Sequence, residues 1–244
     1  MKIAAYCGTR EIYRDMETSA KSLVANSGVD EVHFVIEDAE FPSDLPEIVA
    51  VHDMSGQEWF DHDGPNMDAP YTYMAMMRIA LCHVLPDADA VLSLDADTVC
   101  LPGVDAVWEL PIEGDYLAAS HEWHRSHNGL LYCNFGVVLY NLAKLRDGKA
   151  DECIDVLNRR KYTWVEQDVC NYLCQGRIYD MPWEFNANHW TRENFFKMNA
   201  ADRKRVAKIV HYAGIKDFRH HDEWREYEAV GWDEALERHE AWAR

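Results

Sequence analysis

The chain has 244 residues, 48% of them hydrophobic and 27% charged, which is enough for one sizeable globular α/β domain. Its formal net charge is −19, from 24 basic and 43 acidic side chains. That balance excludes the basic surface needed for nucleic acid or an anionic membrane. If so acidic a protein binds phosphate groups, a divalent cation is the expected source of local positive charge.

No apolar run approaches the roughly 20 residues of a membrane-spanning helix. The first seven residues, MKIAAYC, lead straight into a strand and lack the features of a signal peptide, so we expect a cytoplasmic protein. The seven cysteines form no C-x-x-C pair. We expect buried free thiols rather than disulfides, a zinc site or a redox site.

Apolar patterning in the first hundred residues predicts alternating strands and helices. We expect strands over 2–7, 32–36, 47–52 and 89–94, helices over 11–26 and 71–85, and a loop over 53–70. Such alternation is typical of a largely parallel sheet with helices on both faces. Ligands of these sheets lie beyond the carboxyl ends of the strands.

The second half of the chain is less regular. We expect a strand over 130–142, helices over 143–160 and 165–175, an irregular aromatic and asparagine-rich stretch over 181–196, a strand over 206–212, and a tail over 217–244 that is helical near its end. No linker is visible, so the sequence predicts one domain.

The sharpest local feature is the pair Asp95 and Asp97, which follows the apolar strand 89–94 directly. Two carboxylates one residue apart can face one cation once the strand bends into a turn. Oxygen ligands of this kind suit Mn²⁺ or Mg²⁺. A solvated acidic turn or a helix N-cap is the alternative, because D-x-D is a common pattern.

Three further motifs follow in order: Asn134-Phe135-Gly136, Glu166-Gln167-Asp168, and His211 with Gly214 and Lys216. With D-x-D, this set resembles glycosyltransferase family 8, the glycogenin-like and lipopolysaccharide galactosyltransferase-like enzymes. The resemblance spans about residues 1–218. It implies a GT-A fold, a single Rossmann-like αβα domain with a mostly parallel central sheet, and retention of anomeric configuration.

The resemblance implies a metal site. Asp95, Asp97 and His211 match the residues that hold Mn²⁺ beside the donor diphosphate, with Mg²⁺ as the second possibility. Gly214 would let backbone approach a phosphate, and Lys216 would contact the pyrophosphate. Lys216 follows His211 by five residues, whereas the family has six.

The donor-binding residues are carried over in the same way. Arg78 matches the arginine that reaches the donor sugar and diphosphate, and Asn134 matches a donor-sugar asparagine. Phe135 replaces a small residue of the family, which either alters the sugar pocket or places the ring in the core. In the first loop, the residues that fall where the family builds its uridine pocket are Ala5, Tyr6, Thr9 and Tyr13.

The motif Glu166-Gln167-Asp168 carries the catalytic candidates. Gln167 matches the glutamine below the reacting anomeric carbon, Glu166 replaces an aspartate that binds donor hydroxyls, and Asp168 lies beside them. A retaining outcome needs either front-face attack or a covalent intermediate on Asp168 or Glu166. We favour front-face attack, because a neutral amide is a poor nucleophile.

Two clusters of rings remain. His121, His124 and His127 are interpreted as a polar loop rather than a metal site. The second cluster consists of Trp183, His189 and Trp190. These rings form either a platform for the acceptor or part of the core.

Together these features predict a transferase that moves a hexose, glucose or galactose, from a UDP-sugar to a saccharide or another hydroxyl acceptor. The nucleotide-binding half would span about 1–100, the acceptor side about 101–218 and a helical tail about 219–244. Two alternatives stay open. One is a sugar-phosphate nucleotidyltransferase, although Gly8-Thr9-Arg10 lacks further glycines. The other is an inactive nucleotide-sugar-binding protein, suggested by Phe135 and the shortened spacing before Lys216.

Overall fold

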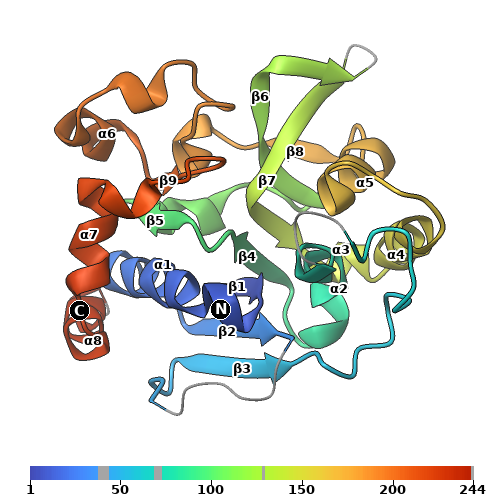
Figure 1. The fold of residues 1–244 in the computed structure, drawn as a ribbon, viewed down its shortest axis with the longest axis horizontal. Coiled ribbons are helices and arrows are strands. Elements are labelled where there is room, and N and C mark those ends of the chain that lie inside the picture. The colour runs from blue at the N-terminus through green and yellow to red at the C-terminus, as the bar shows by residue number, and fades with distance from the viewer. Residues whose placement is uncertain (38–43, 69–72, 128–129, 243–244) are drawn as a thin grey trace.

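The computed structural model describes residues 1–37, 44–68, 73–127 and 130–242. At its centre is a seven-stranded sheet with the order β3-β2-β1-β4-β7-β6-β8 (Figure 1). These strands are β1 (Ile3–Gly8), β2 (Glu31–Ile36), β3 (Val49–Asp53), β4 (Ala90–Leu94), β6 (Leu117–His127), β7 (Leu130–Asn141) and β8 (Ile178–Asp180). Only β7 runs antiparallel to its neighbours, β4 and β6. The sheet is therefore mostly parallel, as the sequence predicts.

Helices cover both faces of the sheet, and each face has its own apolar core. One face carries α1 (Tyr13–Asn26), α7 (Asp222–Ala229) and α8 (Trp232–Glu240); the other carries α2 (Met77–Val84), α3 (Leu142–Leu145), α4 (Lys149–Arg159) and α5 (Val165–Leu173). The strands β1 and β2 are largely apolar because most of their residues are buried.

Two predicted helices differ in detail from the structure. The helix expected over 143–160 is divided into α3 and α4 at Gly148, whose φ of +105° is unfavourable for other residues. The helix expected over 71–85 begins with a 3-10 turn at Tyr73–Ala75 before α2, and residues 71–72 lie outside the described part.

The segment that contains His121, His124 and His127 is a strand, so its interpretation as a loop is wrong. Residues 117–127 form β6, which pairs with β7 through a register that shifts twice. The irregular register explains the failure, because it interrupts the alternation of buried and exposed side chains that marks a strand. The side chain of His127 lies outside the described residues.

A second, two-stranded sheet pairs β5 (Thr98–Cys100) with β9 (Ile209–His211) in antiparallel fashion. The sequence did not reveal β5 or β8, because three residues are too few to show a period. Before β9 lies α6 (Ala200–Val206). The seven cysteines are free thiols, as expected, and six of them are buried while Cys7 is half-buried. The sulfur atoms of Cys153, Cys170 and Cys174 lie within 4.8 Å of one another. Within the described ranges, no helix is both long and apolar enough to cross a membrane.

Candidate active site

The small sheet brings two distant parts of the chain together beside the end of β4. Thr98 pairs with His211 across the β5–β9 ladder, and the Tyr212 amide donates to the Asp97 carbonyl at 2.9 Å. The Asp95 amide in turn donates to the Gly136 carbonyl at 2.7 Å. Backbone bonds therefore fix both aspartates relative to the histidine.

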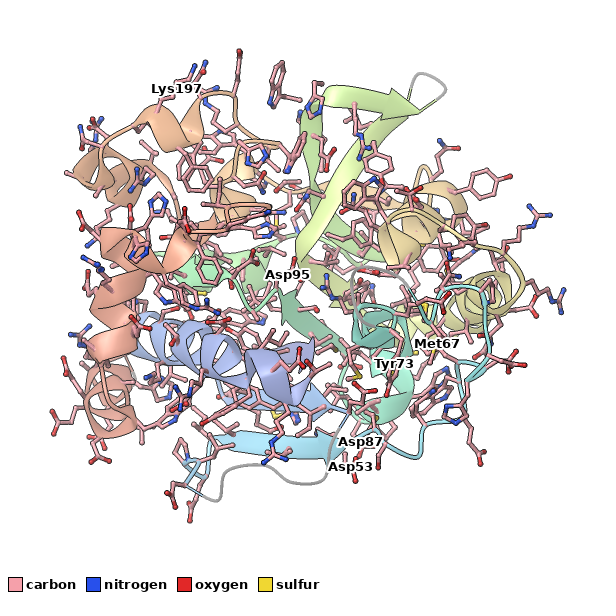
Figure 2. The ribbon with its side chains drawn as sticks, in the orientation of Figure 1. Asp53, Met67, Tyr73, Asp87, Asp95 and Lys197 are labelled. Carbon is pink, nitrogen blue, oxygen red and sulfur yellow. The ribbon has the colours of Figure 1, made fainter. Side chains whose placement is uncertain are left out.

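The three predicted metal ligands, Asp95, Asp97 and His211, converge in the structure. Nε2 of His211 lies 3.4 Å from Oδ2 of Asp95 and 3.4 Å from Oδ1 of Asp97. One ligand atom from each residue lies within 4.8 Å of the others. Figure 2 shows Asp95 near the centre of the molecule, beyond the end of β4. Two carboxylates and one imidazole form a donor set that fits Mn²⁺ or Mg²⁺.

The charges of these three residues are strongly coupled. Burial would lower the pKa of His211, but the charges of Asp97 and Asp95 and their hydrogen bonds raise it to about 9. Burial would raise the pKa of Asp95, but Arg78 and His211 lower it to about 2. In the metal-free protein an imidazolium thus lies against two carboxylates, where a cation would replace its proton.

Gly136 belongs to a motif seen in the sequence, but the sequence did not reveal its role in this site. A Cβ at this position would overlap the ring of His211, so only glycine allows the ring to reach the two aspartates. The glycine lies within β7 and is followed by buried apolar residues. A glycine inside a strand is the sequence signal for such a close approach.

An asparagine cluster behind His211 was also missed. Oδ1 of Asn186 lies 2.8 Å from Nδ1 of His211, and Asn188 Nδ2 lies 3.3 Å from the same atom. Asn186 also donates to Oδ1 of Asn134 at 3.0 Å. By accepting a hydrogen bond from Nδ1–H, Oδ1 of Asn186 orients the ring so that Nε2 faces the aspartates. The asparagine richness of 181–196 was the available signal.

Asn134 connects this cluster to a buried acid. Its Nδ2 donates to Oε1 of Glu122 at 3.2 Å, and Glu122 is only 3% exposed. The other Glu122 oxygen accepts from Arg125 at 3.3 Å. The ring of Phe135, next to Asn134, is buried in the core, so the second of the two expectations for this residue holds. Glu122 is a further candidate, absent from the sequence prediction because it belongs to no motif.

Arg78 lies buried beneath the aspartates. Its guanidinium donates to Asp95 and, at 2.7 Å, to the Phe135 carbonyl, and it lies 3.4 Å from Oε1 of Glu166. Burial raises the pKa of Glu166 to about 7, although Arg78 opposes this. Oε2 of Glu166 is buried without a hydrogen-bond partner among the described residues. It therefore has an acceptor position to offer a ligand hydroxyl.

The other two residues of this motif are engaged within the protein. Gln167 accepts the Phe135 amide at 3.0 Å and donates to the Tyr132 hydroxyl at 3.0 Å. Asp168 accepts from the Tyr132 hydroxyl at 2.6 Å and from the Trp164 amide at 2.9 Å. Asp168 thus satisfies the amide of Trp164, the residue that precedes α5.

Two candidate residues flank the turn after β9. Gly214 has a φ of +72°, and the Ile215 amide donates to the Tyr212 carbonyl at 2.8 Å. Lys216 is exposed and makes no hydrogen bond or ion pair with the described residues. Its ammonium group can therefore move toward a ligand.

Among the candidates for the uridine pocket, Ala5, Thr9 and Tyr13 make no hydrogen bond or ion pair with the metal-ligand candidates within the described part of the chain. Ala5 is fully buried within β1 and pairs with strands on both sides. Thr9 directly follows β1. Tyr13, at the start of α1, lines a hollow of about 490 Å³ together with Lys21 and Arg219, and none of the metal-ligand candidates lines it.

The aromatic candidates separate into two places. Trp183 packs against Phe195, with ring centroids 6.3 Å apart, and lies under Arg192. His189 and Trp190 instead contact each other and lie in the segment next to Asn188. The predicted trio therefore does not form one platform.

Comparisons with known proteins identify the family and the fold. The family model described as Glycosyl transferase family 8 matches residues 4–217. A Haemophilus influenzae protein named "Putative glycosyltransferase" is 26% identical over 157 residues, covering 59% of this chain and 48% of that protein. The chain thus spans about half the length of that relative.

Two solved structures show a similar fold. The glycosyltransferase GlyE of Streptococcus pneumoniae has a TM-score of 0.75 at 18% identity, covering 99% of this chain and 64% of that one. The galactosyltransferase LgtC, solved with donor and acceptor sugar analogues, has a TM-score of 0.61 at 20% identity, covering 99% and 96%. The chain therefore belongs to glycosyl transferase family 8 and has the GT-A fold.

Proposed function

We propose that this protein is a metal-dependent, retaining glycosyltransferase that moves a hexose, glucose or galactose, from a UDP-sugar to a hydroxyl of a saccharide or another acceptor. The observation that carries the proposal is the convergence of Asp95, Asp97 and His211 beside the end of β4. Family membership supplies the reaction class.

The metal ligands act on the leaving group. A divalent cation held there, Mn²⁺ or else Mg²⁺, stabilises the negative charge that develops on the departing diphosphate. Arg78 holds Asp95 ionised and in place, because its guanidinium is buried against that carboxylate. Lys216, exposed and unpaired within the described residues, would contribute a further positive charge to the diphosphate.

The other side of the site would bind the sugar. Oδ1 of Asn134 accepts from the Gly136 amide at 3.1 Å, and Oε1 of Glu166 lies 3.4 Å from Arg78. Oε2 of Glu166 has no hydrogen-bond partner among the described residues and can accept a sugar hydroxyl. Both oxygens of Asp168 are occupied by Tyr132 and Trp164, which disfavours Asp168 as a nucleophile. The other candidate nucleophile is Glu166, to which we assign the binding of a sugar hydroxyl. We therefore favour front-face attack, in which the departing phosphate accepts the acceptor proton and Gln167, with one amide N–H not used by Tyr132, orients the sugar.

Thermal unfolding with nucleotide sugars tests the proposal. UDP-glucose or UDP-galactose at about a hundred times its Kd should raise Tm by about 5 °C or more when Mn²⁺ is present. Without metal, or in Asp97→Asn, the shift should disappear. Asp63→Asn, which changes an exposed acid in a loop, is the matched control and should keep it. Equal shifts with and without Mn²⁺ would contradict metal dependence.

Product analysis separates the alternatives. A transferase releases UDP from the UDP-sugar, whereas a nucleotidyltransferase releases pyrophosphate from a nucleoside triphosphate and a sugar phosphate. A protein that binds the donor in calorimetry but never releases UDP, even to water, would be an inactive binding protein. Retention is checked by the anomeric configuration of the product.

A further inference from the structure

Two exposed tryptophans lie beside the candidate metal ligands. Trp123 on β6 is 49% exposed and Trp190 is 36% exposed. The ring of His124 stacks on Trp190 with centroids 5.1 Å apart, and the ring of His189 lies 4.3 Å from Trp190. Trp123 and His124 are also 5.1 Å apart. We call these four residues, Trp123, His124, His189 and Trp190, the aromatic shelf.

Hydrogen bonds hold the aromatic shelf in place. The Trp123 amide donates to the Trp190 carbonyl at 2.9 Å, and the Trp123 indole donates to the His189 carbonyl at 3.1 Å. The Trp190 amide donates to Oδ1 of Asn188 at 2.7 Å. Large apolar rings are therefore fixed in contact with solvent, an arrangement that marks a binding surface.

Two residues that are adjacent in the chain to the aromatic shelf contact residues of the candidate active site. Asn188, which precedes His189, lies 3.3 Å from the ring of His211. Glu122, which precedes Trp123, accepts from Asn134. The hairpin of β6 and β7 extends past the rest of the sheet, with the chain that follows β8 alongside it (Figure 1). A molecule on the aromatic shelf would thus lie next to the bound donor.

We infer that the aromatic shelf is the acceptor subsite and that its ligand is a neutral pyranose sugar. This inference rests on the proposed transferase function. One face of a pyranose carries only C–H groups, which pack against the electron-rich face of an indole ring. The ring nitrogens of His124 make no hydrogen bond with the described residues, so they remain available to sugar hydroxyls.

Charge favours a neutral ligand over an anionic one. The protein carries a net charge of −19. A sialylated or phosphorylated saccharide would approach against this field. The same net charge argues against an anionic lipid surface as the partner of the two tryptophans.

Saccharide binding can be measured directly by saturation-transfer NMR with methyl β-glucoside, methyl β-galactoside and lactose. With diamagnetic Mg²⁺ and UDP present, wild-type protein should transfer saturation to the ring C–H protons of at least one sugar. Trp190→Ala should remove that signal, and Trp190→Phe should retain part of it. Trp242→Ala, which removes a 46% exposed tryptophan just after α8 that hydrogen-bonds to the Ala25 carbonyl, should leave it unchanged.

Kinetics separate this inference from the proposed function. With the best sugar of that panel, Trp190→Ala should raise the acceptor KM about tenfold, a loss of about 1.4 kcal/mol. Hydrolysis of the UDP-sugar without acceptor should stay within about twofold of wild type, because no donor ligand is changed. If Trp190→Ala leaves both the acceptor KM and the hydrolysis rate unchanged, the aromatic shelf is not the acceptor subsite, while the proposed transferase function still stands.

Two other outcomes would also overturn the inference. One is a wild-type protein that contacts none of the three sugars. The other is cosedimentation with phosphatidylcholine vesicles that Trp190→Ala abolishes while sugar contacts persist, since this would assign the tryptophans to a membrane surface. Absence of UDP release by every variant, wild type included, would instead refute the transferase function itself.

Discussion

At the scale of single residues, the site depends on how closely side chains approach one another. His211 reaches Asp95 and Asp97 only because Gly136 has no side chain, and its ring is turned by Asn186. These two residues carry no catalytic chemistry, yet the geometry of the three ligands depends on them. They are positioning residues.

Gly136→Ala tests this dependence. The added methyl would push the ring of His211 away from the aspartates, so Mn²⁺-dependent stabilisation by a UDP-sugar should be lost. Overpacking should also cost about 1–3 kcal/mol of unfolding free energy. Calorimetric Mn²⁺ titration and urea unfolding measure the two effects. Gly114→Ala, where a Cβ would meet open space, should change neither. Normal Mn²⁺ affinity in Gly136→Ala would contradict the steric argument.

At the scale of elements, the segment after β9 is anchored by a buried ion pair between α6 and α7. Nε and Nη2 of Arg203 donate to the two carboxylate oxygens of Glu223 at 2.8 and 3.0 Å. Glu223 is fully buried, and the hydroxyl of Tyr212 lies 3.5 Å from it. Tyr212 follows His211, so this pair supports the backbone that carries the imidazole.

Removing one partner of this pair should be costly. Glu223→Ala leaves the buried guanidinium of Arg203 uncompensated, which should lower the unfolding free energy by about 3–5 kcal/mol. Glu226→Ala breaks the neighbouring exposed pair with Lys204 and should cost at most about 1 kcal/mol. Urea unfolding of both variants provides the comparison. Equal losses would show that burial of the Arg203 pair contributes nothing.

At the scale of the whole molecule, the protein is strongly acidic, with a net charge of −19. Because the pKa of His211 is raised in the folded state, both the free energy of unfolding and the affinity for metal should depend on pH. Folding raises this pKa from 6.5 to about 9, so the native metal-free state holds a proton that the unfolded state releases earlier. The resulting stabilisation is complete below pH 6.5, declines as pH rises, and is absent above about 9.

Metal binding should show the opposite trend. Because Mn²⁺ needs a neutral imidazole, its apparent affinity should rise with pH by up to about tenfold per unit until pH 9. Titrations at several pH values between 6.5 and 9 measure the slope, and His211→Gln should flatten it. A wild-type affinity that stays constant over this range would refute the imidazole as a ligand whose proton the metal displaces.

The sequence by itself determined the features that are local and periodic. Alternating apolar segments predicted the parallel strands, and the apolar run before Asp95 placed the acidic pair at a strand end. The ordered motifs indicated the family, which the family match over 4–217 confirms. Each of these depends on residues that are neighbours in the chain, so the pattern is visible before folding.

Only the tertiary structure decided which residues meet across the fold. The pairing of β5 with β9, the close approach of Gly136 to His211, and the hydrogen bond from His211 to Asn186 join parts of the chain that are far apart. The strand character of β6 likewise depends on pairing with β7. Such contacts arise from long-range packing, and no local propensity or spacing specifies them.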